Sequence, residues 1–571
     1  MNDERKSGGL FGRLARGLRS GPAPGKTDGI QAIEHAGAPT TENAAQPGAS
    51  ELISEGLLRR EQAGAAAALP LFEQAAELAP NSYLPFLMLG NAASEMDDLD
   101  RAATYFERAR DLEPSNHVIR YNLGLNHLWR GYIQFAIEEL RTACRLNPSY
   151  DPAQFALIMA LHNSDRVSPE QIANDIRGWA ARFALQHPVA VRSVTPDREF
   201  PRKLRVGFVS GDLRTHSVAH FFEPILSARN GDAFEYHLYH TSPHQDAVTE
   251  RLRACADRWH DVWQLSDDAL IELIRANRTD MLVDLSGHTE FNRLSVFARR
   301  AAPVQVTYLG FPNSTGLATM DYRITDDATD PYPVADGWHS ETLLRLPDSQ
   351  WCFRPFGTPP AAGPLPARSL GYVTFGSFNN LTKASDTVLR CWTQILVNLP
   401  TSRLRLTRIR SPQRARELVA AFEKSGIAAE RIECAPYKLE VPHGRQFDGV
   451  DIALDHYPYN GVTTTCESLY VGVPVISLYG RNCVSRSGLS LLDTLGLAEL
   501  VASTPDQYVE IALALAKDLP RLEILRAGLR SRFDLSPLRT EKRFAANFEQ
   551  LLRSAWQQYL LFQTDLRPQG T

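Results

Sequence analysis

The chain has 571 residues, of which 43% are hydrophobic and 22% are charged, as in most globular proteins. Its net charge of -5 at pH 7 disfavours a protein that binds nucleic acid over its whole surface. The seven cysteines include no CxxC pair, which disfavours a disulfide framework or a structural zinc site and is typical of a reducing compartment. No apolar run reaches the roughly 18–20 residues that span a bilayer, and no continuous apolar stretch follows the basic N-terminus as a secretory signal requires. We therefore expect a cytoplasmic protein without stable membrane association and without a nucleic-acid partner.

Residues 1–50 are rich in Gly, Ala, Pro and Thr and lack a sustained apolar period, which predicts a disordered N-terminal segment. Within it, "LFGRLARGLRS" is compatible with a short basic amphipathic helix on an anionic membrane, but a solvated tail is the simpler interpretation. Folded structure is expected from residue 51 onward.

A repeat occupies residues 51–165. The segments "FEQAAELAPNSYLPFLMLG", "FERARDLEPSNHVIRYNLG" and "LRTACRLNPSYDPAQFALI" align without gaps, and Pro80, Pro114 and Pro148 are 34 residues apart. This is the period of the tetratricopeptide (TPR) repeat, a helical hairpin in which small residues let the helices approach and proline ends the second helix. We predict an all-α TPR superhelix, whose concave face is suited to binding a peptide.

A linker is expected at residues 166–201. Ser168, Pro169 and Gln171 form a capping-box pattern, which predicts a helix that runs through Trp179 and Phe183. The following "VTPDREFPRK" reads as an extended connector.

Two α/β domains are predicted after the linker, at residues 202–366 and 367–571. Short apolar runs alternate with helical stretches, as in parallel sheets covered on both faces, and a Pro/Gly-rich stretch at 354–371 separates two series of them. The predicted strands are 204–210, 235–241, 281–287 and 304–310 in the first series, and 372–378, 403–409, 431–437, 451–457 and 474–480 in the second. Tandem Rossmann-like domains bind ligands at the carboxyl ends of their strands, which predicts a site in the cleft between the domains.

The stretch "YNGVTTTCESLYVGVPVISL" carries a candidate phosphate site. A strand at 451–457 leads into a helix predicted at 464–471, with Gly461 in the turn between them. Unpaired backbone N–H groups and the helix dipole favour a phosphate at such a helix start, and threonine hydroxyls add donors. The alternative is an ordinary threonine cap without a ligand.

Two neighbours favour a nucleotide-diphosphate site. Lys383 follows "SFNNLTK" at the end of a predicted strand and is a candidate cation for a pyrophosphate, and Glu467 lies one turn into the threonine helix, where it can accept from a sugar diol. The sequence has no Walker A motif and no GxGxxG, which disfavours triphosphate hydrolysis and dinucleotide chemistry.

Histidines and carboxylates near the predicted strand ends are further candidates. His216 and His220 share a helix face if their segment is helical, and either imidazole suits proton acceptance, with Asp212 orienting His216. Each histidine has the alternative role of orienting a substrate, with donor phosphate or water taking the proton. Asp284 and His288 are candidates at another strand end. "DDATD" at 326–330 resembles a metal-carboxylate cluster but is better interpreted as a capped loop.

Together these motifs resemble a known family. The 34-residue repeats, "VGFVSGDLRTHSVAHF", "VQVTYLGFPNSTG", "TFGSFNNLTK" and "DIALDHYPYNGVTTTCESLYVGVPVISLYG" are similar, in order, to protein O-GlcNAc transferases and SPINDLY-type O-fucosyltransferases, over about residues 70–555. The resemblance implies an α/β GT-B glycosyltransferase that inverts the anomeric carbon, uses a nucleotide sugar, and needs no metal and no cofactor. Its acceptors would be Ser or Thr hydroxyls of proteins, handled through the TPR region.

The resemblance also implies roles for single residues. Lys383 and Asn380 would contact the donor diphosphate, and Thr463 and Thr464 would bind phosphate. Glu467 would bind ribose and His443 would pack on the nucleobase. Leu309, Gly310 and Pro312 match a loop near the donor sugar. His216 matches a histidine beside the reaction centre, so His216 and Lys383 are the catalytic candidates.

The chain also departs from the animal enzymes. Val462 replaces a histidine, so both UDP-GlcNAc and GDP-fucose stay open as donors. Met88 and Ala156 interrupt the asparagine ladder to which Asn122 would belong. Other functions also stay open: a TPR scaffold with an inactive transferase domain, and a transferase for small molecules or glycans.

Overall fold

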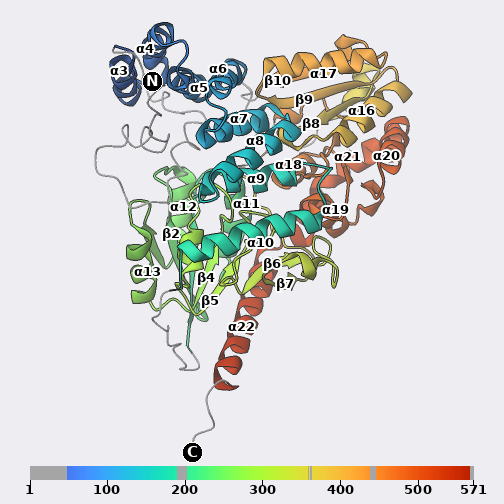
Figure 1. Cartoon of the computed structure of the whole chain (residues 1–571). Coiled ribbons are helices and arrows are strands. Elements are labelled where there is room, and N and C mark those ends of the chain that lie inside the picture. Colours follow the sequence, from blue (N-terminus) through green and yellow to red (C-terminus); the bar gives the residue numbers. More distant parts are fainter. Residues whose placement is uncertain (1–47, 190–201, 358, 361–362, 437–444, 566–571) are drawn as a thin grey trace, which may run out of the picture. The chain divides into compact units, whose positions relative to one another are not determined.

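The computed structural model describes residues 48–189, 202–357, 359–360, 363–436 and 445–565 (Figure 1). The chain forms two compact units. One runs to Ser164 and takes in Asn380–Thr382 and Arg408–Ala421, and the other comprises Asp165–Asn379, Lys383–Thr407 and the chain from Phe422 onward. The predicted connector at 194–203 lies almost entirely outside the described residues.

The first unit consists of helical hairpins, which confirms the predicted repeats. Its helices are α3 (Ala49–Ala63), α4 (Ala65–Leu78), α5 (Tyr83–Glu95), α6 (Leu99–Leu112), α7 (His117–Arg130), α8 (Ile133–Leu146) and α9 (Asp151–His162). α4, α6 and α8 each end two residues before the repeated proline, as the ring of proline requires.

Glycines set the distance between the helices of each hairpin. A Cβ atom on Gly90 would lie 2.4 Å from the ring of Phe106, and one on Gly124 would lie 2.7 Å from Leu140. These separations are shorter than any real carbon–carbon contact, so the first helix needs glycine where the second helix crosses it. The small residues predicted from the repeat pattern therefore have a packing role.

Polar contacts join residues 408–421 to the repeats within this unit. Arg410 pairs with Asp97 at 3.2 Å, Ser411 donates to Asp100 at 2.6 Å, and Tyr132 donates to Glu417 at 2.6 Å. Helix α17 (Pro412–Lys424) begins in this segment.

The second unit contains two parallel sheets. The first has the order β3-β2-β1-β4-β5-β6-β7, and the second has the order β10-β9-β8-β11-β12-β13. The strands of the first are β1 (Leu204–Ser210), β2 (Phe234–His240), β3 (Arg258–Asp261), β4 (Met281–Asp284), β5 (Val304–Thr307), β6 (Tyr322–Asp326) and β7 (Thr342–Leu346). The strands of the second are β8 (Thr374–Ser377), β9 (Arg403–Ile409), β10 (Ile432–Pro436), β11 (Ile452–Leu454), β12 (Val475–Leu478) and β13 (Val501–Ala502). Both orders are doubly wound, as predicted.

Sequence reasoning missed four strands: β3, β7 and β13 lie at sheet edges, and β6 lies next to the edge strand β7. β3, "RWHD", is polar and partly exposed, and β13 has two residues. β6 and β7 each contain an arginine and lie beyond the strands with continuous apolar runs. Because edge strands bury less surface, their sequences need not be apolar, and the apolar-run signal fails there.

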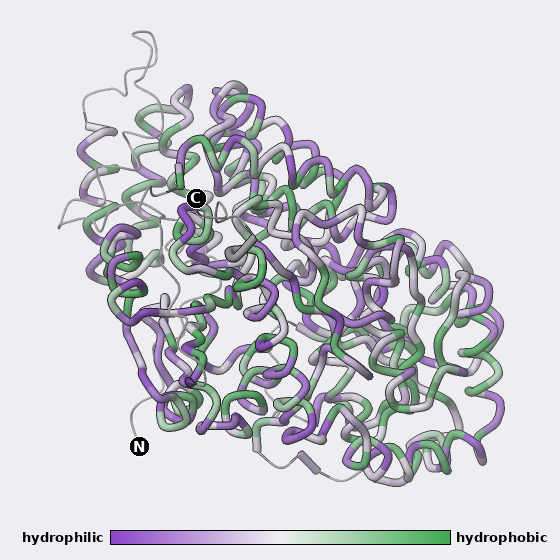
Figure 2. The backbone as a smooth tube through the Cα atoms, turned by 90° about the horizontal axis from the view of Figure 1, so that it is seen from below, coloured by the Kyte–Doolittle hydropathy of each residue, from purple (hydrophilic) through white to green (hydrophobic). Residues whose placement is uncertain are grey.

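The helices of the second unit alternate with the strands. They are α10 (Pro169–Gln186), α11 (Ser217–Ser227), α12 (Ala247–Cys255), α13 (Asp267–Ala276), α14 (Leu294–Ala298), α15 (Pro366–Leu370), α16 (Asp386–Asn398), α18 (Thr463–Tyr470), α19 (Ser487–Thr494), α20 (Pro505–Lys517), α21 (Leu519–Asp534) and α22 (Glu541–Asp565). α10 has the predicted capping box on Ser168 and buries Trp179 and Phe183. Green and purple alternate along the helical coils in Figure 2, as expected for amphipathic helices. None of the described helices is long and apolar enough to cross a membrane.

The last helix returns to the first sheet. Phe548, Leu552 and Trp556 of α22 belong to the same buried cluster as Phe208 of β1 and Val283 of β4. In the same region, Glu549 accepts from the backbone N–H of Asn230 at 2.8 Å. The core of the first sheet is thus completed by residues from the end of the chain.

The glycine contacts in the first unit are testable. We expect Gly90→Ala to lower the free energy of unfolding by about 1–3 kcal/mol, because the added methyl overpacks the contact with Phe106. Gly178→Ala in α10 is the matched control, because its Cβ would meet only Arg182 at 3.8 Å. There, alanine should stabilise the exposed helix position by up to about 1 kcal/mol. Thermal unfolding followed by circular dichroism measures both, and a neutral Gly90→Ala would contradict the packing role.

Candidate active site

Helix α18 begins at the carboxyl end of the second sheet, as predicted for the phosphate site. Val462 occupies the N-cap without a side-chain cap, so Thr463 and Thr464 are the first two helical residues. The Thr464 hydroxyl donates to Asn379 at 2.7 Å and the Thr465 hydroxyl donates to the Gly461 carbonyl at 3.1 Å. Of the three threonines, Thr465 stabilises the turn itself through its bond to Gly461.

The turn before α18 is built around the buried carboxylate of Asp455. One oxygen of Asp455 accepts from the backbone N–H of Gly461 at 2.8 Å, from the N–H of His456 at 2.9 Å and from the Asn379 amide at 3.2 Å. The other oxygen accepts from Ser477 at 2.9 Å. Asp455 therefore fixes Asn379, which in turn fixes the hydroxyl of Thr464.

Burial raises the pKa of Asp455 to about 6, although its hydrogen bonds and the Lys383 ammonium oppose the shift. The lack of a Cβ on Gly461 is part of the same construction. A Cβ there would lie 2.4 Å from the Thr464 hydroxyl and 2.7 Å from the Asn379 amide nitrogen. Glycine is therefore needed for Asn379, Thr464 and the turn to meet.

Lys383 reaches the same turn from the segment after β8. It ends the short 3-10 helix Leu381–Lys383, and its ammonium donates to the Asn460 carbonyl at 3.3 Å. The ammonium also lies 3.8 Å from the ring centroid of Tyr459, in cation–π geometry. The structure thus brings Lys383 and the start of α18 together, as the sequence predicted.

Three candidates on the second sheet remain: Glu467, Asn380 and His443. Glu467 lies in α18 and is nearly buried, with 8% of its surface exposed. Asn380 accepts from the backbone N–H of Thr382 at 3.1 Å, a local turn that orients the segment before Lys383. His443 lies outside the described residues.

Asp212 and His216 meet at the carboxyl end of β1. His216 is the N-cap of α11, and its Nδ1 accepts from the backbone N–H of Val218 at 3.3 Å. The Asp212 carboxylate lies 3.5 Å from the same Nδ1. Desolvation lowers the pKa of His216, while Asp212 opposes this and Arg214 adds to it. Because 38% of the side chain is exposed, this desolvation is incomplete.

His220 is a packing residue, and the condition for a shared helix face, that both His216 and His220 be helical, is not met. His216 has extended backbone before the helix, so only His220 lies on α11. The His220 ring stacks on Phe356 at 3.7 Å between centroids, and its Nδ1 donates to the Arg354 carbonyl at 2.7 Å. These contacts hold the His220 ring against the segment that contains Arg354 and Phe356.

Asp284 and His288 shape the loop after β4. Asp284 accepts from the backbone N–H groups of Ser286 and Gly287 and from the Thr307 hydroxyl at 2.8 Å. Burial raises its pKa to about 6. The His288 ring makes edge contacts with Phe311 and with Trp179 of α10, at 5.0 and 4.8 Å between centroids.

The loop with Leu309, Gly310 and Pro312 follows β5 and turns tightly. Leu309 has a φ of 64°, which is unfavourable for a residue with a side chain, and the Gly310 N–H donates to the Tyr308 carbonyl at 2.8 Å. A Cβ on Gly310 would lie 2.0 Å from the Leu285 carbonyl oxygen, so the loops after β4 and β5 touch through backbone.

The segment 326–330 is a capped loop, as predicted. Asp326 accepts from the backbone N–H of Thr329 at 2.6 Å and from the N–H of Gln350 at 2.8 Å. It also accepts from Ser490 of α19 at 2.7 Å. Because Asp326 ends β6 and α19 follows β12, this contact joins the carboxyl ends of the two sheets.

Comparison with known proteins identifies the family of this chain. The sequence model of glycosyl transferase family 41 matches residues 184–352 and 365–548, more than half of the chain. The chain belongs to glycosyl transferase family 41. This confirms the resemblance found in the sequence motifs.

Curated relatives match about two thirds or more of the chain. The chain is 36% identical over 422 residues to the Petunia hybrida protein named probable UDP-N-acetylglucosamine–peptide N-acetylglucosaminyltransferase SPINDLY, which covers 73% of this chain and 45% of the relative. It is 30% identical over 395 residues to the Arabidopsis thaliana protein of that activity named SEC, covering 66% of this chain and 40% of the relative. The chain thus spans less than half the length of these curated relatives.

A solved family 41 structure matches nearly the whole chain. A mutant of the Thermobaculum terrenum O-GlcNAc transferase has a TM-score of 0.80 and 36% identity, covering 91% of this chain and 99% of that one. The helical repeats followed by two Rossmann-like domains therefore form the TPR plus GT-B architecture predicted from the sequence.

Sequence reasoning on this family 41 chain missed Asn379 and Asp455. Asn379 stands next to Asn380 in "SFNNLTK", and Asp455 ends a predicted strand in "DIALDHY". The sequence did offer one signal for Asp455: an aspartate at the end of an apolar strand, followed by a turn that contains Gly461. The contacts that distinguish Asn379 from Asn380 span 76 and 85 residues of chain, so no local pattern shows them.

Asp455 yields a prediction on stability. Asp455→Ala leaves three buried N–H donors without an acceptor, and we expect the free energy of unfolding to fall by about 3 kcal/mol or more. Asp455→Asn keeps one oxygen for those donors and turns its amide toward Ser477, so we expect a loss of about 1 kcal/mol or less at pH 4, where Asp455 itself is protonated. Urea unfolding measures both. Equal losses in the two variants would contradict the acceptor role.

The same residue yields a pH prediction. A pKa raised to about 6 in the fold means that between pH 4 and 6 the folded chain holds a proton that the unfolded chain has released, so wild type loses stability as the pH rises. Asparagine mimics the protonated form and cannot lose that proton. We expect the stability of Asp455→Asn relative to wild type to increase by up to about 2–3 kcal/mol from pH 4 to pH 7. A difference that does not change with pH would contradict the shift.

Proposed function

We propose that this chain is an inverting glycosyltransferase that moves GlcNAc from UDP-GlcNAc to Ser or Thr hydroxyls of proteins. The observation that carries the proposal is the meeting of Lys383, the start of α18 and the turn held by Asp455 at one sheet edge. Family membership and the activities for which the SPINDLY and SEC relatives are named support the reaction class. The TPR unit supports a peptide acceptor, and the proposal places the protein in the cytoplasm.

The leaving diphosphate gains negative charge as the glycosidic bond breaks. The ammonium of Lys383 and the N–H groups at the α18 start are held in place before the reaction, so stabilising this charge requires little reorganisation. Asp455 holds the Gly461 backbone by its N–H, and Asn379 holds the Thr464 hydroxyl, which keeps the helix start open for phosphate. In this proposal the transfer needs no metal and no cofactor.

The role of His216 follows from its tautomer. Nδ1 accepts from the Val218 N–H, so a neutral His216 carries its proton on Nε2 and donates from there. In that state it orients an oxygen of the donor or acceptor, and the acceptor proton passes to donor phosphate or water. To act as a base through Nε2, the ring would have to release Val218 and donate from Nδ1 to Asp212.

His216 variants separate these roles. We expect His216→Gln, which keeps a side-chain donor, to retain at least about tenfold more kcat than His216→Ala. We also expect no loss of kcat as the pH falls through the ordinary histidine range. If Gln and Ala are equally inactive and the wild-type kcat drops with histidine protonation, His216 is the base.

The second candidate donor is GDP-fucose, which stays open because Val462 stands where the animal enzymes have a histidine. Radiolabelled UDP-GlcNAc and GDP-fucose, each incubated with the full chain and a cell lysate, distinguish the donors. Label in protein from UDP-GlcNAc supports the proposal, and label from GDP-fucose alone overturns the donor. Label only in small molecules points to a glycan or metabolite acceptor. Absence of label and of donor hydrolysis, with no UDP binding, points to an inactive scaffold.

Lys383 offers the sharpest test of the proposed site. We expect Lys383→Ala to lower kcat by about a hundred- to a thousandfold, with a smaller effect on donor affinity, because the ammonium acts mainly on charge that develops in the transition state. Lys383→Arg should not rescue fully, since a planar fork does not replace a compact ammonium over the Tyr459 ring. Lys517→Ala, at the last turn of α20, is the control. Steady-state kinetics of donor turnover measure the effect, and near-normal kcat in Lys383→Ala would refute the assigned role.

A further inference from the structure

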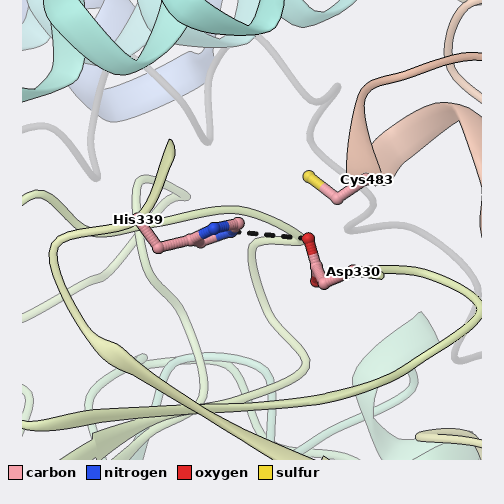
Figure 3. A group of neighbouring side chains, drawn as sticks. All are labelled: Asp330, His339 and Cys483. Carbon is pink, nitrogen blue, oxygen red and sulfur yellow. Dashed lines mark ion pairs between the residues drawn. The ribbon is translucent and has the colours of Figure 1, made fainter. Parts of the chain in front are cut away.

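Three potential metal ligands meet where the loops of the two sheets adjoin. Asp330 follows β6, His339 follows the 3-10 helix Ala335–Trp338, and Cys483 begins the 3-10 helix Cys483–Ser485 after β12. All three are buried, and one ligand atom from each lies within 4.8 Å of the others. Figure 3 shows the His339 ring and the Asp330 carboxylate pointing toward each other, with Cys483 entering from a separate segment.

The imidazole of His339 is arranged as in a metal-bound histidine. Its Nδ1 donates to the Ala335 carbonyl at 2.9 Å, so in the neutral ring the lone pair is on Nε2. Nε2 has no hydrogen-bond partner among the described residues, and its side chain is 1% exposed. A backbone carbonyl on the other ring nitrogen is the usual device that orients a histidine toward a metal.

Nε2 faces a carboxylate oxygen. The Asp330 Oδ1 atom lies 3.6 Å from it, and a lone pair so placed against an anion is repulsive unless a proton or cation lies between them. The other oxygen, Oδ2, accepts from Arg323 at 2.5 Å and from Thr325 at 2.6 Å. The carboxylate is thus held from behind, and Oδ1 remains directed at His339.

The charges of the cluster also favour a cation. Two guanidinium groups, Arg323 and Arg486, interact here with three carboxylates, Asp330, Glu341 and Asp326, which leaves one negative charge over when the carboxylates are ionised and the Cys483 thiol is neutral. A divalent cation that binds Cys483 as a thiolate would bring the cluster to neutrality. Buried charges are otherwise costly unless they are paired.

We propose that Asp330, His339 and Cys483 bind a zinc ion that links the two Rossmann-like domains. Sulfur, imidazole and carboxylate ligands suit zinc, with a fourth position open to water. Bonds of about 2.0–2.3 Å put tetrahedral ligand atoms roughly 3.3–3.8 Å apart, so His339 and Asp330 are already at that spacing. The Cys483 thiol must exchange its contact with Asn482, at 3.1 Å, for the ion.

Binding exchanges a proton for the metal. The S–H bond of Cys483 breaks, sulfur donates to zinc, and one proton is released to solvent for each ion bound. None of the three ligands belongs to the proposed donor site, so the ion has a structural role. The absence of CxxC disfavours only a zinc site whose ligands are close in sequence, and here His339 and Cys483 are over 140 residues apart in the chain.

Zinc titration of the chelator-treated full-length chain tests the site. In competition with a chromophoric chelator, we expect one zinc per chain, with about 100-fold or more weaker binding in Cys483→Ser and in His339→Gln. Calorimetry in buffers of different ionisation enthalpy should show about one proton released per zinc. Cys255→Ser, a partly exposed cysteine in α12, is the matched control and should bind as wild type.

Cobalt gives a spectroscopic signal that reports directly on a thiolate ligand. We expect Co²⁺ added to the wild-type chain to give a thiolate-to-metal charge-transfer band with tetrahedral d–d bands, which zinc displaces and Cys483→Ser lacks. Zinc should also raise the unfolding temperature of wild type by a few degrees and leave Cys483→Ser unchanged. No thiolate band, no stoichiometric zinc, or equal binding in wild type and Cys483→Ser overturns the proposal.

Discussion

In each sheet, a buried carboxylate lies at the end of a strand where the order of successive strands reverses. In the first sheet β4 lies beside β1, and in the second β11 lies beside β8, the two positions where doubly wound strand order reverses. Asp284 ends β4 and Asp455 follows β11, and each accepts backbone N–H groups from the loop that comes next. Burial raises the pKa of both to about 6. Through these hydrogen bonds, the two side chains fix the conformation of the loops that follow two central strands. The candidate site lies on those loops.

The consequence is clearest in the second sheet. The carboxylate of Asp455 is buried, and it accepts hydrogen bonds from the Gly461 backbone and the Asn379 amide. Asn379 then holds the Thr464 hydroxyl, and Gly461 leaves the space in which all three meet. Lys383 approaches the same turn and interacts favourably with Asp455. A phosphate site of the proposed kind needs buried groups that hold its donors in place before the ligand binds.

In both units of the chain, glycine allows two elements to pack closer than a side chain would permit. In the TPR unit, Gly90 and Gly124 let one helix cross its neighbour at a distance that a methyl would prevent. In the second unit, Gly310 lets the loops after β4 and β5 touch through backbone. In each place the absence of a side chain defines the separation of two elements, and the surrounding residues are packed to that separation.

Much of this protein can be read from its sequence alone. The 34-residue period, the capping box at Ser168, the central strands and the start of α18 all follow from local spacing, because helix ends, proline and continuous apolar runs act over a few residues. Lys383, Thr464 and Glu467 could be singled out for the same reason. The tertiary structure alone decided that His220 packs while His216 caps a helix, that the end of the chain completes the first sheet's core, and that β3 and β13 exist. It also decided which asparagine of "SFNNLTK" serves the site, and it brought Cys483 to Asp330 and His339. These outcomes depend on contacts between distant segments, whose energies come from burial and pairing that no short window of sequence contains.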